Sequence, residues 1–153
     1  MKKENSITIE GVTINLNTKP EELMATGKFR EYESESFEEN HTNLLTAEDW
    51  IEAFGTKCAG QLYFGNSYID IKLYPKLDIQ SPGYPDPDFE KASWEVCKTI
   101  IENNFDNIEY KEDMVSATFS QGKVATFLIP EGKQNEWTGG YISIVIREKE
   151  NVY

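Results

Sequence analysis

The residues of this chain that could do chemistry are one histidine, two cysteines and many carboxylates. His41 is the only histidine, and a catalytic histidine works with a nucleophile and an orienting acid that no local motif supplies here. Cys58 and Cys97 are far apart and lack the C-x-x-C spacing of zinc or redox sites. We therefore expect a solvated histidine, two buried thiols, and no catalytic residue, metal site or cofactor.

The carboxylates are the side chains of this chain that could form a binding site for a partner. Between Glu31 and Thr56 there are eight acids and no lysine or arginine: Glu31, Glu33, Glu35, Glu38, Glu39, Glu48, Asp49 and Glu52. Aromatic side chains lie among them, and such a mixture steers a basic protein and then holds it. The candidate partner-binding residues are Glu31, Tyr32, Glu33, Glu35, Glu38, Glu39 and Trp50. A solvated acidic face explains the same stretch.

The net charge of −12, from 15 basic and 27 acidic residues, limits the partners. Binding to nucleic acid draws on clustered Lys and Arg that neutralise phosphates, so nucleic acid and anionic membranes are excluded. A basic protein such as a toxin remains allowed. The sequence has no apolar run long enough to cross a membrane and no secretory leader, which predicts a cytoplasmic protein. The oligomeric state stays open.

One long helix is expected to position the rest of the chain. Its length of 153 residues suits a single domain over residues 1–153. Pro87 to Asn104 carries apolar residues at spacings of three and four, and Asp86 is placed to cap its first turn. Charged residues occupy the opposite face. A helix with one apolar face must pack on a sheet or on another helix, and most of the remaining sequence has strand patterns.

The first half of the chain predicts short elements. Apolar residues alternate on both sides of Glu10-Gly11, which predicts a hairpin. A short helix is expected from a Thr18 cap to Thr26, with Glu21 reaching back to the cap and Gly27 ending it. From Phe29 to Phe37 the period becomes two. This predicts a strand with Glu31, Glu33 and Glu35 on one face, either a protected sheet edge or a row of the acidic binding face.

Residues 46–55 predict a two-turn helix, because Thr46 can cap it and Gly55 can end it. An extended interpretation stays open, since Trp50, Phe54, Cys58 and Leu62 share a strand parity.

Strand patterns dominate the chain from Gln61 onward. Strands at Gln61–Phe64 and Tyr68–Tyr74 flank a Gly65-Asn66 turn, and a proline-rich connection then runs from Pro75 to Pro87. After the helix, four strands are expected at 108–110, 115–119, 124–129 and 141–147, with the middle pair turned at Gln121-Gly122.

These elements predict an α+β fold. We expect a single twisted antiparallel sheet packed by one long helix and one or two short helices. A helix followed by antiparallel strands occurs twice along the chain, so two helix-plus-meander units are a further interpretation.

Several motifs together resemble a group of known proteins. They are Ile-x-Ile-Glu10-Gly11-Val-x-Ile-x-Leu16, Thr18-Lys-Pro-Glu-Glu-Leu23, Leu62-Tyr-Phe64-Gly-Asn66-x-Tyr-Ile69-x-Ile71 and Ile142-x-Ile144-x-Ile146. The chain is similar in these to small uncharacterised bacterial α+β proteins, some of them immunity-type partners of secreted toxins. The resemblance implies a cytosolic, non-enzymatic protein, such as an acidic inhibitor of a basic toxin. It carries over no functional residue.

An alternative function is a small-ligand-binding protein or enzyme. Its pocket would lie between the sheet and the loops, with Trp137 and the Pro75 to Pro87 connection as a roof. Outside that hypothesis, Trp137 is explained equally well as a loop residue packed on the fold or as an exposed contact residue.

Overall fold

The computed structural model describes residues 3–33, 41–65, 67–77, 87–128 and 140–147. These residues form one antiparallel sheet and two helices, which confirms the α+β class. In chain order the elements are β1 (Thr8–Ile9), β2 (Val12–Thr13), α1 (Pro20–Met24), β3 (Phe29–Glu33), β4 (His41–Ala47), β5 (Ile51–Ala53), β6 (Thr56–Gly65), β7 (Tyr68–Pro75), α2 (Pro87–Asn104), β8 (Ile108–Lys111), β9 (Met114–Phe119), β10 (Gly122–Phe127) and β11 (Ile142–Arg147).

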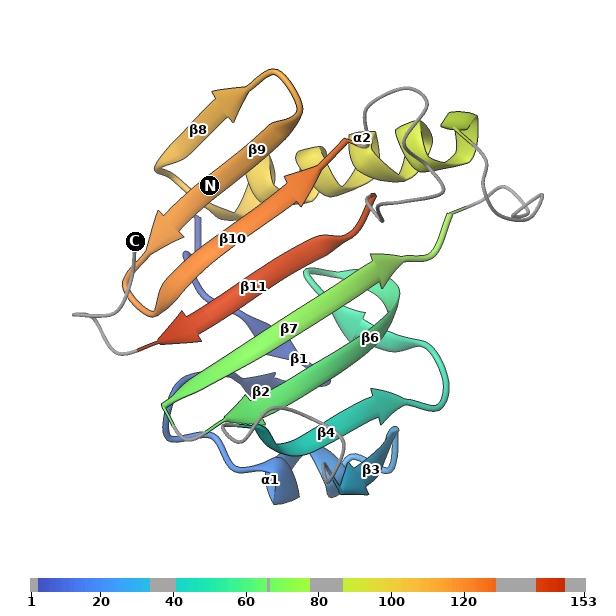
Figure 1. Ribbon diagram of the computed structural model, residues 1–153, viewed down its shortest axis with the longest axis vertical. Helices are drawn as coiled ribbons and strands as arrows, with labels where there is room; N and C mark the ends of the chain where they lie inside the picture. The colour runs from blue at the N-terminus through green and yellow to red at the C-terminus, as the bar shows by residue number, and fades with distance from the viewer. Residues whose placement is uncertain (1–2, 34–40, 66, 78–86, 129–139, 148–153) are drawn as a thin grey trace.

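The strand order of the sheet is β2-β1-β5-β6-β7-β11-β10-β9-β8, and β4 and β3 extend it beside β6. Each helix precedes an antiparallel meander, and the two meanders meet where β7 pairs with β11. Strand β11 follows every other described strand along the chain, yet it lies between β7 and β10 in the middle of the sheet (Figure 1).

Helix α2 has the predicted bounds and packs on β10, β9 and β7 with its apolar side. Cys97, Ile101 and the adjoining Phe105 are fully buried, while Lys91 and Glu95 face solvent. In Figure 1 the helix lies behind the strands, on the same side as the β1–β2 hairpin. The apolar spacing therefore predicts the buried face correctly, because a helix with one apolar stripe can bury it in only one orientation. Asp86, the expected cap, lies outside the described residues.

The centre of the core is the junction of β7 and β11. Ile69, Ile71 and Leu73 of β7 stand directly opposite Ile146, Ile144 and Ile142 of β11. All six side chains are buried, and burying one side chain of this size contributes about 1.5–3 kcal/mol. The predicted alternation of both strands is confirmed.

Residues 46–55 are not a helix, and this prediction was wrong. β4 and β5 both pair with β6. Between the pairs Thr46–Gln61 and Ile51–Cys58, the chain advances by five residues from β4 to β5 but by only three residues along β6. The extra residues form a bend at 48–50, as in a β-bulge. Pairing along β6 outweighs the local capping signals. The extended alternative is correct in kind but not in parity, because Trp50 is exposed.

The start of α1 differs from the prediction by one residue. Its N-cap is Lys19, whose backbone N–H donates to the Glu22 carboxylate at 2.6 Å, so Glu21 does not close the capping box. The Thr18 hydroxyl instead donates to the Thr13 carbonyl at 3.1 Å and accepts the Asn15 N–H at 2.9 Å. Thr18 therefore connects the end of β2 to the start of the helix through local side-chain hydrogen bonds to the backbone, and it does not cap the helix.

Two further turns test the sequence patterns. The Glu10-Gly11 hairpin is confirmed, with φ of 49° and 80° as tight hairpin turns require. The β9–β10 turn lies at Ser120–Gln121 and not at Gln121-Gly122, because Phe119 and Gly122 already pair. Gly122 is needed for a different reason. A Cβ at this position would lie 1.9 Å from the Val145 carbonyl oxygen of the neighbouring strand.

The N-terminal segment closes on the end of α2. Asn5 donates its backbone N–H to the Asn104 carbonyl at 3.1 Å, and its side chain exchanges two hydrogen bonds with Asp106, at 2.7 and 3.0 Å. The Lys3 ammonium donates to the Phe105 carbonyl at 3.0 Å. These contacts satisfy carbonyls that a helix end leaves without partners, and the positive charge suits that end of the helix dipole.

Candidate functional site

The acidic row predicted from Phe29 onward begins on an edge strand. Within the described part of the chain β3 pairs with β4 alone. Glu31 is exposed, and its carboxylate accepts a hydrogen bond from the Asn43 amide at 2.9 Å. The backbone of Tyr32 and Glu33 continues β3. Glu35, Glu38 and Glu39, which complete the predicted row, lie outside the described residues.

The second part of the acidic stretch occupies the bend between β4 and β5. Glu48, Asp49 and Trp50 are all exposed, and Trp50 keeps 40% of its surface in solvent. The Asp49 carboxylate accepts the Trp50 N–H at 2.8 Å, which fixes the bend. The Lys76 ammonium lies 5.2 Å from the centre of the Trp50 ring, within cation–π range. The bend therefore presents an ordered aromatic side chain beside two carboxylates.

The described acids of this stretch do not form one cluster. Glu31 pairs with Leu45 across β3 and β4, whereas Glu52 pairs with Lys57 across β5 and β6. The β6 partners of Leu45 and Glu52, Leu62 and Lys57, are five positions apart, which is roughly 17 Å along a strand. The eight acids lie within one stretch of the sequence, but the described ones do not share one face. The register places Glu31 on the face of the buried Leu45, and Glu52 on the face opposite the buried Ile51.

The two thiols are buried, as predicted, and are poor nucleophiles. Burial raises the pKa of Cys58 to about 11, and burial as the main cause raises the pKa of Cys97 to about 12. Cys97 also donates its S–H to the Gly140 carbonyl at 3.6 Å. Only a thiolate attacks electrophiles or binds metal readily, so neither cysteine is activated near neutral pH. Among the described residues no group of three or more His, Cys, Asp or Glu could hold a metal ion.

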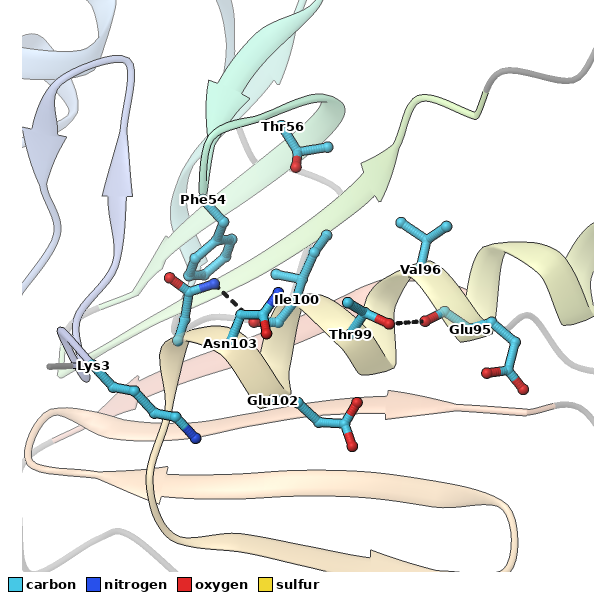
Figure 2. A pocket seen from close by; sticks show the side chains of 10 residues that line it. Lys3, Phe54, Thr56, Glu95, Val96, Thr99, Ile100, Glu102 and Asn103 are labelled. Atoms are coloured by element: carbon cyan, nitrogen blue, oxygen red, sulfur yellow. Dashed lines mark hydrogen bonds between the residues drawn. The ribbon is translucent and has the colours of Figure 1, made fainter. Parts of the chain in front are cut away.

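The surface is hollowed on both sides of the β5–β6 turn. A groove of about 860 Å³ separates the turn from α2, with Phe54, Val96 and Ile100 along it (Figure 2). A second groove of about 570 Å³ lies toward β1 and is lined by Glu10 and Glu52. Most of the roof predicted for a pocket between sheet and loops, Trp137 and residues 78–86, lies outside the described residues. The Phe54 grooves were missed because Phe54-Gly55 was interpreted as the end of a helix.

Comparison with protein-family models, with curated proteins and with solved structures finds no match for this chain. No described helix combines the length and apolar character needed to span a membrane.

Proposed function

We propose that this chain is a non-enzymatic binding domain that engages a basic protein, as an immunity-type inhibitor engages a toxin in the cytoplasm. The observation that supports this proposal is the bend at 48–50. It exposes Trp50 at 40% between the β4 and β5 strands, next to Glu48 and Asp49. A large exposed aromatic side chain is a common anchor of binding energy in protein interfaces, and neighbouring acids speed the approach of a basic partner.

The two thiols give no support to an enzyme with a cysteine nucleophile. An enzyme that uses a cysteine nucleophile needs a lowered thiol pKa and an accessible sulfur. Here burial moves both thiol pKa values upward, and Cys58 and Cys97 have no exposed surface. The charge of −12 suits a basic partner, since attraction between opposite net charges speeds association.

The decisive experiment uses the genes next to the one that encodes this chain. Each neighbouring reading frame is expressed in a bacterial host, alone and together with this chain. The proposal predicts that one basic product inhibits growth, and that this chain relieves the inhibition and co-purifies with the product. A set of neighbours without a toxic product, or toxicity that this chain does not relieve, would contradict the immunity assignment.

The role of the bend is tested on the complex that this experiment yields. Reversing charge with Glu48→Lys and Asp49→Lys should weaken partner affinity by about tenfold or more and flatten its dependence on salt. The control reverses Glu112 and Asp113, two exposed acids in the β8–β9 turn. Equal effects of the two reversals would mean that net charge, and not the bend, attracts the partner.

A further inference from the structure

Phe54 occupies a backbone conformation that its side chain disfavours. The β5–β6 turn is Phe54-Gly55, with φ of 55° and 71°. Positive φ is natural for Gly or Asn in a tight hairpin turn, but for a bulky aromatic residue it costs of order 1 kcal/mol or more. The turn itself therefore gives no reason for a phenylalanine at this position.

Contacts on one side of the ring hold it in place. Phe54 meets the buried Phe105 edge to face, with ring centres 6.0 Å apart and planes at 66°. The other side of the ring remains partly exposed, because Phe54 lines the grooves on both sides of the turn. The strained turn thus fixes an aromatic ridge between two hollows at the protein surface.

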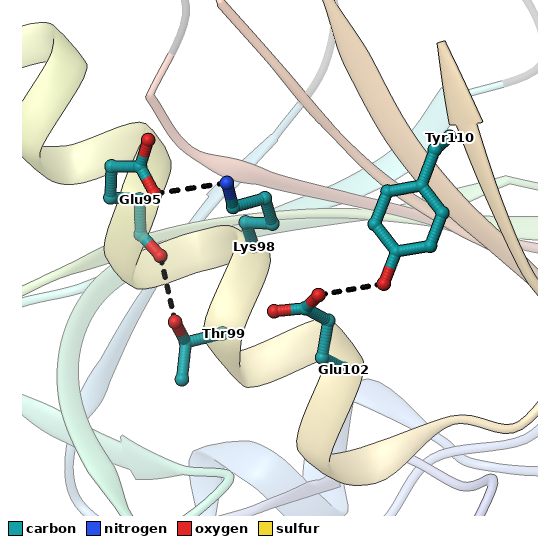
Figure 3. Close-up of polar contacts among 5 residues, drawn as sticks. All are labelled: Glu95, Lys98, Thr99, Glu102 and Tyr110. Atoms are coloured by element: carbon teal, nitrogen blue, oxygen red, sulfur yellow. Dashed lines mark hydrogen bonds and ion pairs between the residues drawn. The ribbon is translucent and has the colours of Figure 1, made fainter.

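The groove beside α2 has an apolar strip with acids along the helix. Phe54, Val96 and Ile100 form the strip, and Figure 2 shows Glu95 and Glu102 on the helix beside it. Glu95 pairs with Lys98 at 3.0 Å, and Glu102 accepts the Tyr110 hydroxyl at 2.6 Å (Figure 3). Because tyrosine is neutral, the Glu102 contact orients the carboxylate without cancelling its charge.

The groove toward β1 is more acidic. Glu4, Glu10 and Glu52 line it, and none of the described residues that line it is a lysine or arginine. The Glu10 carboxylate accepts the Glu52 backbone N–H at 2.6 Å, which fixes it at the rim. Among the described residues that line the groove beside α2, Lys3 is the cation, and its ammonium already donates to the Phe105 carbonyl at 3.0 Å.

We propose that these paired grooves bind a basic amphipathic segment of the protein partner. Apolar side chains of the segment pack on Phe54, Val96 and Ile100, and its lysines or arginines lie against Glu10 and Glu52. Charge complementarity selects a cationic occupant, and the apolar strip selects a polypeptide over a simple polyamine, which has no side chains to pack there. This inference rests on the proposed function and places a second contact surface beside the bend at 48–50.

The test measures binding of short fluorescent peptides by anisotropy. One peptide alternates lysine with leucine, one alternates lysine with serine, and one alternates glutamate with leucine. The lysine–leucine peptide should bind about tenfold more tightly than either control. Equal binding of the two lysine peptides would reduce the interaction to unspecific charge attraction and overturn the inference.

Variants of the chain locate the binding. Phe54→Asn suits the positive φ of the turn, so the fold is kept while the ridge is removed, and the affinity for the lysine–leucine peptide should fall about fivefold or more. Val96→Lys, at a partly exposed position, should do the same through repulsion. The control, Asp113→Asn, removes an exposed acid in the β8–β9 turn, outside both grooves, and should leave peptide binding unchanged. Affinity unaffected by both groove variants would overturn the inference.

The same variants separate this inference from the proposed function. Phe54→Asn and Val96→Lys could abolish peptide binding while the variant chains still relieve the toxicity of the neighbouring gene product and bind it with unchanged affinity. In that case the grooves are not the surface that contacts the partner, and the proposed binding function stands. If no neighbour is toxic while peptide binding depends on Phe54, the grooves stand and the immunity assignment fails.

Discussion

Replacing Gly122 by alanine should destabilise the sheet more than any change in an exposed turn. The three atoms nearest to a Cβ at this position all belong to the backbone. They are the Val145 oxygen at 1.9 Å, the Val145 carbonyl carbon at 2.9 Å and the Ile146 Cα at 3.0 Å. Ordinary contact begins near 3.4 Å, so the two strands must separate by about 3.4 − 1.9 = 1.5 Å. No side-chain rotation can relieve a clash with backbone atoms.

The magnitude depends on the contacts that this displacement disrupts. Gly122 pairs with Ile146, and beside this pair the Arg147 N–H donates to the Gln121 carbonyl at 3.1 Å. Losing one such hydrogen bond costs about 1 kcal/mol. Ile146 is fully buried, and forced rearrangement of a packed core costs about 1–3 kcal/mol. We therefore expect Gly122→Ala to lower the free energy of unfolding by about 3 kcal/mol.

Equilibrium unfolding in urea measures this change. The matched control is Gly11→Ala, because Gly11 has φ of +80° and no atom lies within 4 Å of the position that an alanine Cβ would take. It therefore reports backbone strain alone, about 1 kcal/mol. If Gly122→Ala costs no more than Gly11→Ala, close approach of β10 and β11 is not the reason for the glycine and the reasoning is refuted.

Three other experiments test the remaining constraints. Gly140→Ala should cost about 2 kcal/mol in thermal unfolding, since φ is +67° and its Cβ would lie 3.0 Å from a carbonyl of α2; a loss below that of Gly11→Ala would contradict this. Folding raises the pKa of Cys58 to about 11 and of Cys97 to about 12 from an ordinary 9.0, so both thiols support folding fully below about pH 9 and this support is lost as the pH rises through those values. Unfolding at pH 8 and pH 10 should show a smaller alkaline loss when both are alanine, and an equal loss would exclude the thiols as its cause. Asn5→Ala should cost about 1–2 kcal/mol by urea unfolding, because it removes two side-chain hydrogen bonds to Asp106 and places alanine at φ 51°; stability equal to the parent would show that the N-terminal segment does not hold the end of α2.

The sequence predicts those elements in which a regular spacing of apolar residues shows which face is buried. The stripe of α2 and the alternation of β7 and β11 each leave only one face that can be buried, so Ile101 and Ile144 are placed by pattern alone. The Glu10-Gly11 turn is also local, because its geometry depends on the two residues that form it.

The other features of the fold and of the candidate site depend on contacts between segments that are distant in the sequence. Residues 46–55 contain helix signals, but hydrogen bonds to β6 decide their conformation. Gly122 looked like a turn residue, and only the position of Val145 on the next strand reveals its use. The Phe54 grooves require β5, α2 and the N-terminal segment together. The spacing of residues along the chain gives no information about contacts between segments that are far apart in the sequence.

The position of β11 has a consequence for synthesis of the protein. Because β11 fills the centre of the sheet but is made after β7 and β10, a growing chain holds two incomplete sheets with unpaired apolar edges until this strand leaves the ribosome. Its pairs, from Leu73–Ile142 to Tyr68–Arg147, join segments distant in sequence and close slowly. Premature stops before Ile142 should therefore yield aggregates rather than shortened folded proteins.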